Sequence, residues 1–171
     1  MADAFNELFD TFEREAFRLE TLDTYSVPSS NPSLHAFLDG HPKPDDYNRA
    51  WCSEVQAITQ AGKRIYRVHV LSRPLTPYLR FELGWGYRTN ATAGEEFHIL
   101  DTTDQPNPVS AASDFWLFDE ATAVTMNYDA DGAIVSREIL PGDSAADYVA
   151  LRDTALRHAV PFADWWAKYG E

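Results

Sequence analysis

The chain has 171 residues, and its 14 Lys and Arg against 27 Asp and Glu give a formal net charge of -13. A chain of this length fits one domain, residues 1–171, which can bury roughly 70% of its unfolded surface and needs neither a disulfide nor a metal to fold. The acidic charge disfavours direct binding to nucleic acid, whose phosphates bind Lys and Arg, and no apolar run approaches the ~20 residues of a membrane span.

The N-terminal segment predicts a helix followed by a strand. Apolar residues recur at helical spacing from Phe5 onward, and Asp3 stands where a helix cap is expected, so the spacing predicts an amphipathic helix over residues 3–15. From residue 17 apolar and polar residues alternate, which predicts a short strand that reaches Tyr25. A run rich in proline and serine then ends regular structure.

Two helices and a strand are predicted next. Residues 34–38 favour a short helix, and Asp45 is expected to cap a longer helix that carries Trp51 on its apolar face and ends at Gly62. Residues 63–72 predict a strand, because β-branched and aromatic residues fill a run of strand length. Its alternation places two sets on opposite faces: Ile65, Arg67, His69 and Leu71 on one, and Tyr66, Val68 and Val70 on the other.

A helix with two internal glycines is predicted over residues 78–87. Gly84 and Gly86 each cost about 1 kcal/mol relative to Ala in a helix interior, so we expect this helix to pack closely on a neighbouring backbone. A strand over residues 95–101 follows it, again with alternating apolar and polar side chains.

The second half of the chain is dominated by a predicted β-meander over residues 114–140. Period-two alternation marks its strands, Asp119–Thr122 forms the first turn, and Asp131–Gly132 forms the second, where Gly132 supplies the positive φ of a tight hairpin. Residues 145–158 then predict a helix, which ends before Pro161.

These elements predict one α+β domain, in which a mixed β-sheet with this meander is flanked by helices. The expected strands are Ile65 to Leu71, Phe97 to Leu100, Phe115 to Phe118, Val124 to Tyr128 and Ile134 to Ile139. The expected core residues are Phe9, Phe12, Leu19, Trp51, Val68, Val70, Leu79, Leu83, Phe97, Ile99, Phe115, Leu117, Val124 and Met126.

Charged and aromatic side chains gather at the junction between the strand at 63–72 and the helix at 78–87. Such junctions let backbone N–H groups and side chains converge on a small anion, and Tyr78 and Glu82 share a helix face at i, i+4 spacing. We therefore expect a ligand site there, and if the protein were an enzyme, Asp119 or His98 would be its proton carrier. The candidate ligand-binding residues are Arg73, Tyr78, Arg80, Glu82, His98 and Asp119.

Ordinary structural roles remain open for the same residues. Glu82 or Glu20 would neutralise Arg80 or Arg18 in a salt-bridge network. Asp101 and Asp119 fit either turn positions or paired carboxylates. His69 and His98 occupy strands expected to be neighbours and face each other on one surface, either as ordinary satisfied histidines or as a functional pair.

No motif for a known catalytic or cofactor site is present. The sequence contains no G-x-S-x-G, no phosphate-binding P-loop, no G-x-G-x-x-G and no H-E-x-x-H. Cys52 is the only cysteine, which excludes a disulfide within the chain and a cysteine-based zinc site, and we expect it to fill core space. We therefore expect no metal and no cofactor, and the absence of a signal-peptide pattern at Met1–Ala4 predicts a cytoplasmic protein.

Four motifs, in order, resemble an uncharacterised family: A-F-R-L-E-T-L-D-T-Y at 16–25, R-V-H-V-L-S-R-P-L-T-P-Y-L-R-F-E-L at 67–83, A-G-E-E-F at 93–97 and D-F-W-L-F-D at 114–119. The family is an actinobacterial, Streptomyces-like domain of unknown function. Its genes often lie beside genes for helix-turn-helix regulators, so the resemblance implies a stand-alone protein that works with such a DNA-binding partner.

The order of strands and helices from Arg64 to Leu140 also resembles half of a phospholipase-D-type domain. Such domains carry a His-x-Lys pair in the region that corresponds to Ala111–Asp114, where this chain has neither His nor Lys. The resemblance therefore implies a catalytically dead version of that domain with a binding or scaffold role.

We accordingly expect a non-enzymatic binding or regulatory accessory protein that acts through a protein partner such as a helix-turn-helix regulator. The alternative is a small enzyme, or a protein that binds a small anion or metabolite, with its pocket at Arg73 to Glu82. For the partner, an exposed Trp165–Trp166 pair would supply aromatic anchors, and the acidic surface would attract a basic protein. The same two tryptophans would instead belong to the core if they fold back onto the sheet.

Overall fold

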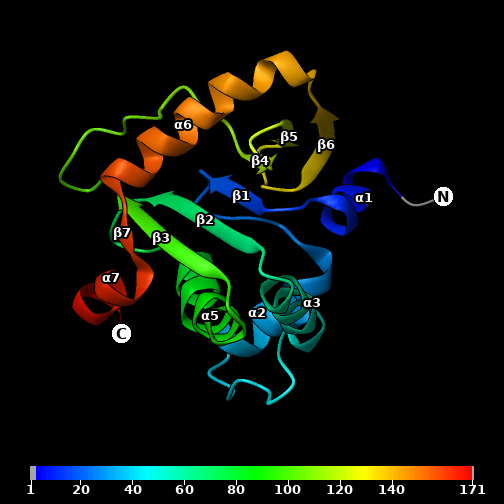
Figure 1. Ribbon diagram of the computed structural model, residues 1–171. Helices are drawn as coiled ribbons and strands as arrows, with labels where there is room; N and C mark the ends of the chain where they lie inside the picture. The colour runs from blue at the N-terminus through cyan, green and yellow to red at the C-terminus, as the bar shows by residue number, and fades with distance from the viewer. Residues whose placement is uncertain (1–2, 171) are drawn as a thin grey trace.

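The computed structural model describes residues 3–170 and is built on a seven-stranded mixed sheet in the order β6-β5-β4-β1-β2-β3-β7 (Figure 1). Strand β1 runs parallel to β2, and β2 runs parallel to β3, while all other neighbours are antiparallel. The strands are β1 (Glu15–Glu20), β2 (Arg64–Leu71), β3 (Glu96–Asp101), β4 (Phe115–Phe118), β5 (Thr122–Tyr128), β6 (Ile134–Ile139) and β7 (Val160–Pro161).

Helices cover both faces of this sheet, as Figure 1 shows: α6 crosses one face, and α2, α3, α5 and α7 lie against the other. The helices are α1 (Ala4–Thr11), α2 (Asn31–Leu38), α3 (Arg49–Gln60), α4 (Pro77–Phe81), α5 (Arg88–Ala93), α6 (Ala145–His158) and α7 (Phe162–Tyr169). A π-helical segment, η2 (Glu82–Tyr87), joins α4 to α5, and short 3-10 turns lie at η1 (Pro28–Ser30) and η3 (Gly142–Ser144).

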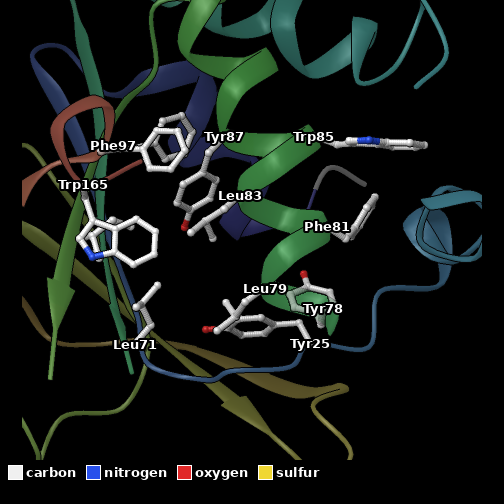
Figure 2. Close-up of a cluster of buried hydrophobic side chains, with 12 residues drawn as sticks. Tyr25, Leu71, Tyr78, Leu79, Phe81, Leu83, Trp85, Tyr87, Phe97 and Trp165 are labelled. Carbon is white, nitrogen blue, oxygen red and sulfur yellow. The ribbon is translucent and has the colours of Figure 1, made fainter. Parts of the chain in front are cut away.

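The α+β class, the five expected strands and the meander are confirmed. Gly132 has a φ of 81°, as the second hairpin turn requires, and the first turn places Asp119 and Glu120 at φ 53° and 59°. Side chains of Tyr66, Val68 and Val70 pack in the core beneath α6, whereas Ile65 and Leu71 pack in cores on the other face. Figure 2 shows that other face, where Tyr87 of η2 stacks on Phe97, and Tyr78 and Phe81 of α4 belong to the same cluster of buried side chains.

The expected core is confirmed except at Phe9 and Trp51. Both are half-buried, because they line a surface cavity of about 460 Å³ between α1, α3 and the sheet. Leu117 is 1% exposed and Phe115 is fully buried, and the other two residues of β4, Trp116 and Phe118, are buried against the opposite face.

Several predicted boundaries and local features are wrong. The first helix ends at Thr11, and the strand after it spans Glu15–Glu20 and does not reach Tyr25. Asp45 does not cap α3, since Asn48 occupies the N-cap position.

The reason expected for the two glycines of η2 is also wrong. A Cβ at Gly84 would meet the Trp166 side chain, and one at Gly86 would meet the Tyr47 side chain, so aromatic rings and not a neighbouring backbone approach this helix. Residues 162–169, for which no helix was predicted, form α7.

The two strand histidines do not share a surface. His69 pairs in register with Ile99, and His98 pairs with Val68. Because successive residues of a strand point to opposite faces, His69 lies on the face of α4 and η2, and His98 lies on the face of α6. Their expected juxtaposition is therefore wrong.

Across residues 3–170, no helix is both long enough and apolar enough to span a membrane. The resemblance to half of a phospholipase-D-type domain stays a prediction.

Candidate functional site

The six candidate ligand-binding residues are divided among different parts of the fold. Arg73 and Arg80 line one surface pocket, while Tyr78 is buried in the core beside it. The others lie elsewhere: Glu82 reaches a buried polar network, His98 lies on the α6 face, and Asp119 lies in the β4–β5 turn.

Asp119 has a structural role. Its carboxylate accepts hydrogen bonds from the backbone N–H groups of Glu13, Arg14 and Glu15 at 2.7 to 3.0 Å. Partial burial alone would raise its pKa, but these three donors stabilise the ionised form and lower the pKa below its usual value. Asp101 lies at the opposite end of the sheet, since β4 runs antiparallel to β1 and β3 parallel to it, so the two do not form a carboxylate pair.

The surface pocket has a volume of about 730 Å³ and lies between α2, the α4–η2–α5 helix and α7; we call it the arginine–aromatic pocket. It is lined by Phe37, Leu38, Arg73, Pro74, Leu75, Pro77, Arg80, Gly84, Trp85, Arg88, Trp166 and Tyr169. The Arg73 guanidinium stacks 4.0 Å from the centre of the Tyr169 ring and donates to Asp101 at 2.7 Å. Three guanidinium groups and four aromatic rings therefore surround one cavity.

The two C-terminal tryptophans differ in environment. Trp165 is 3% exposed, and its Nε1–H donates to the Asp101 carboxylate at 2.9 Å, so for this residue the core alternative is correct and the exposed alternative is wrong. Trp166 is half-buried and forms part of the pocket wall. Of these two tryptophans, Trp166 is the one that lines the pocket and is available as an aromatic anchor.

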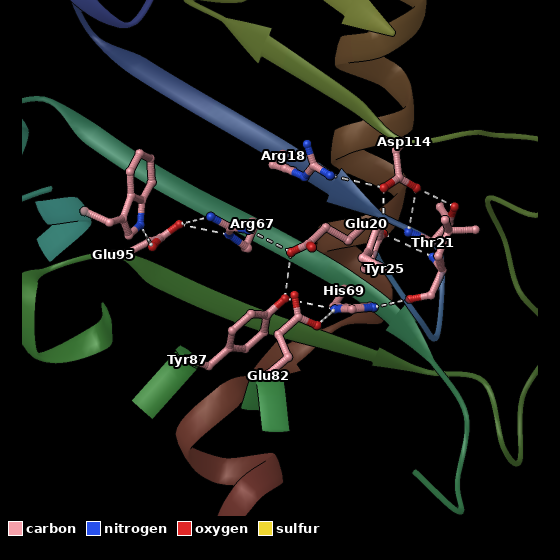
Figure 3. A network of polar contacts seen from close by, with 12 residues as sticks. Arg18, Glu20, Thr21, Tyr25, Arg67, His69, Glu82, Tyr87, Glu95 and Asp114 are labelled. Atoms are coloured by element: carbon pink, nitrogen blue, oxygen red, sulfur yellow. Dashed lines mark hydrogen bonds and ion pairs between the residues drawn. The ribbon is translucent and has the colours of Figure 1, made fainter. Parts of the chain in front are cut away.

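A second polar site is a buried network on the sheet face beneath α4 and η2 (Figure 3). Arg67 lies at its centre: Nη1 donates to Glu20 at 2.9 Å, and Nε donates to Glu95 at 2.8 Å. The other carboxyl oxygen of Glu95 accepts from the Trp51 indole N–H at 2.8 Å. Arg18 pairs with Asp114 at 3.3 Å. A salt-bridge network that includes Glu20 and Arg18 is present as predicted, but its ion pairs are Arg67 with both Glu20 and Glu95, and Arg18 with Asp114.

The sheet register explains how these residues meet. Strand β1 lies between β2 and β4, and Arg18 pairs in register with Arg67 on one side and with Trp116 on the other. Each of the four motifs that carry the family resemblance contributes to the network, since Arg18, Arg67, Glu95 and Asp114 come from different motifs.

One end of the network brings Glu20, His69, Glu82 and Tyr87 together (Figure 3). The Tyr87 hydroxyl donates to Glu20 at 2.7 Å and lies 2.9 Å from His69 Nδ1. Glu82 and Tyr87 approach His69 from the same helix because η2 is π-helical, and its wider turn, with i to i+5 hydrogen bonds, brings residues five apart closer to one side of the helix than an α-helix does.

The two glutamates of this cluster have opposite pKa shifts. Burial raises the pKa of Glu82 well above its usual value, and the neighbouring negative charge of Glu20 raises it further. Burial is the largest single influence on the pKa of Glu20 and would raise it, but the neighbouring positive charges, Arg67 foremost, and the hydrogen bond from Tyr87 together hold that pKa well below its usual value. The cluster therefore holds an ionised carboxylate beside a carboxyl group that binds a proton strongly.

Sequence reasoning did not find this network as a site. The available signal was the presence of Arg18, Glu20 and Arg67 inside strands whose neighbours are apolar, because charged groups in a buried strand must be paired.

Comparison with known families gives one result. The model of a family described as a domain of unknown function, DUF6879, matches residues 3–167. No curated protein matches the chain.

Proposed function

We propose that this chain, which belongs to the DUF6879 family, is a non-enzymatic binding and regulatory protein that acts through a protein partner. The observation that carries the proposal is the arginine–aromatic pocket: Arg73, Arg80 and Arg88 gather around one cavity in a protein whose net charge is -13. Arginine binds carboxylates through paired N–H donors, and aromatic residues in partly desolvated pockets dominate the energy of protein interfaces.

The chemistry of the pocket defines its occupant. The guanidinium groups suit a carboxylate, and the rings of Phe37, Trp85 and Trp166 suit an adjacent aromatic or proline side chain. A partner segment with both features would fill the cavity.

The partner that we propose is the helix-turn-helix regulator of a neighbouring gene, in the actinobacterial cytoplasm. Its identity rests on the family resemblance. Such regulators carry basic DNA-binding surfaces, and the net charge of -13 would speed encounter with a basic protein before the local carboxylate enters the pocket. Added salt should therefore slow association.

The alternative function is a small enzyme, or a protein that binds a metabolite, with the same pocket. A volume of about 730 Å³ falls within the range of roughly 300 to 1,000 Å³ typical of small-molecule sites. The pocket lining includes neither His98 nor Asp119, the proton carriers that the enzyme would need, so the binding role is supported better.

The test is a calorimetric titration of the purified chain with the neighbouring regulator. Arg88→Glu reverses one pocket charge and should weaken binding at least tenfold, which is ~1.4 kcal/mol. Arg157→Glu is the matched control, because this exposed arginine lies on α6, across the sheet from the pocket. Equal effects of the two substitutions, or no binding by the native chain, would reject the partner. A rise in melting temperature on addition of a small carboxylate or phosphate, lost in Arg88→Glu, would support the alternative function.

A further inference from the structure

Glu20, His69 and Glu82 form a compact cluster of metal-binding side chains on the buried face of the sheet. One donor atom from each lies within 4.8 Å of the other two. The side chain of His69 is fully buried, that of Glu20 is 4% exposed and that of Glu82 is 14% exposed. They reach this point from β1, β2 and η2, so tertiary packing alone brings them together.

The hydrogen bonds of His69 direct one ring nitrogen toward the two carboxyl groups. Nε2 lies 2.8 Å from the Leu22 carbonyl oxygen, and a carbonyl only accepts, so Nε2 carries the proton of the neutral ring. The Nδ1 lone pair then faces Glu82 and the Tyr87 hydroxyl oxygen, whose own proton is donated to Glu20. A histidine that binds a metal usually donates its other N–H to a backbone carbonyl or carboxylate in this way.

The facing atom of Glu82 has an unsatisfied lone pair. Glu82 Oε2 is buried, and no hydrogen-bond partner for it is found within residues 3–170. It lies 3.4 Å from His69 Nδ1. Burial of a polar atom without a partner is costly, and two lone pairs that face each other require a proton or a cation between them.

The charges around the cluster also favour a cation. The network contains four carboxyl groups, those of Glu20, Glu82, Glu95 and Asp114, and two guanidinium groups, those of Arg18 and Arg67. Metal binding requires Glu82 to lose its proton, and two carboxylates then remain without a guanidinium to balance them, so one divalent cation carries the charge that would do so.

We propose that Glu20, His69 and Glu82 bind one divalent transition-metal ion. Two ligands about 2.1 Å from a tetrahedral ion are separated by about 3.4 Å, which matches the distance between Nδ1 and Oε2. One imidazole and two carboxylates suit ions of the Zn²⁺ and Mn²⁺ class. The Tyr87 hydroxyl, which bonds Glu20, orients that carboxylate toward the ion.

The experiment uses the tag-free chain after dialysis against a chelator. Zn²⁺, Mn²⁺ and Co²⁺ are added to separate samples. After desalting, mass spectrometry gives the number of metal ions bound per chain. The visible spectrum of bound Co²⁺ reports the type and number of its ligands. The proposal predicts one equivalent of metal and an affinity that falls at least ~100-fold in Glu82→Gln and His69→Gln. Glu82→Gln keeps the side-chain shape, and circular dichroism checks that each variant folds.

The matched control is the double variant Glu96→Gln/His98→Gln, which changes the same residue types on β3, on the opposite face of the sheet. The control should keep one equivalent of metal and the Co²⁺ spectrum. The metal site is refuted if the folded native chain binds no metal, or if Glu82→Gln binds metal as tightly as the native chain does. A proton would then occupy the space between Nδ1 and Oε2. Metal loss in the control alone would place binding elsewhere and would also refute the proposal.

Discussion

Replacement of Arg67 by Met should destabilise the protein far more than the same change at Arg64, three residues earlier in β2. Arg67→Met leaves Glu20 and Glu95, each 3% exposed, without their shared guanidinium. Removing one member of a buried ion pair costs about 3 to 5 kcal/mol, a large part of the roughly 5 to 15 kcal/mol that holds a domain folded.

Arg64→Met is the control for chain position and residue type. Arg64 pairs with Glu96, and their side chains are 43% and 47% exposed, so water already solvates both charges. Exposed ion pairs contribute about 0 to 1 kcal/mol. The free energies of unfolding are compared by urea denaturation of native and variant chains.

The charges of the network, and not the volume of Arg67, should cause most of this loss. Adding Glu20→Gln and Glu95→Gln to Arg67→Met removes the two stranded charges and should restore part of the stability. Equal losses for Arg67→Met and Arg64→Met would show that the network does not stabilise the fold and would refute this reasoning.

Three further substitutions test the fold. Leu117→Ala should lower the free energy of unfolding by about 2 to 5 kcal/mol, because this side chain is 1% exposed; a loss below that range in urea titrations would mean that the sheet core is loosely packed. Asp119→Asn should lower the melting temperature at neutral pH. The difference should start to shrink as the pH falls below about 4, where the unfolded chain binds the proton, and it should vanish only below the lower pKa of the folded carboxylate; a constant difference would contradict this origin. Gly132→Ala should lower the free energy of unfolding by more than about 1 kcal/mol, because the φ of Gly132 is 81° and an added Cβ would overlap the Thr24 carbonyl. Gly142→Ala is the control, since a Cβ there meets no neighbouring atom, and an equal loss for both variants in urea denaturation would contradict this explanation.

The strands could be predicted from the sequence because each carries its own periodic signal. In β4 and β5 alternate residues such as Phe115, Leu117 and Val124 are buried as predicted, although Trp116 and Phe118 between them are buried too because both faces of β4 are covered. The π-helical turn at Glu82–Tyr87 has no such signal, since its residues also fit an α-helix. The helix at 162–169 is short and follows a proline, so its pattern was too brief to distinguish from a loop.

The candidate site was harder to predict, because its contacts depend on sheet order. The sequence shows that Arg18 and Glu20 are near each other. Their ion pairs, Glu20 with Arg67 and Arg18 with Asp114, form only because β1 lies between β2 and β4 in the sheet. The junction at Arg73 and Arg80 could be predicted as a pocket from its composition. The third arginine, Arg88, lies two turns further along the helix, and only the helical geometry brings it to the same cavity.

The most direct test of the proposed binding role is the dissociation constant of the regulator complex for Trp166→Ala, measured with the melting temperature of the free variant. Trp166 lines the pocket but is only half-buried. Trp165 is buried in the core, so its replacement would destabilise the C-terminal helix, and weaker binding could then reflect unfolding. We predict a loss of 2 kcal/mol or more, about 30-fold in the dissociation constant, with a nearly unchanged melting temperature. A dissociation constant equal to that of the native chain, with the variant folded, would contradict partner binding at the arginine–aromatic pocket.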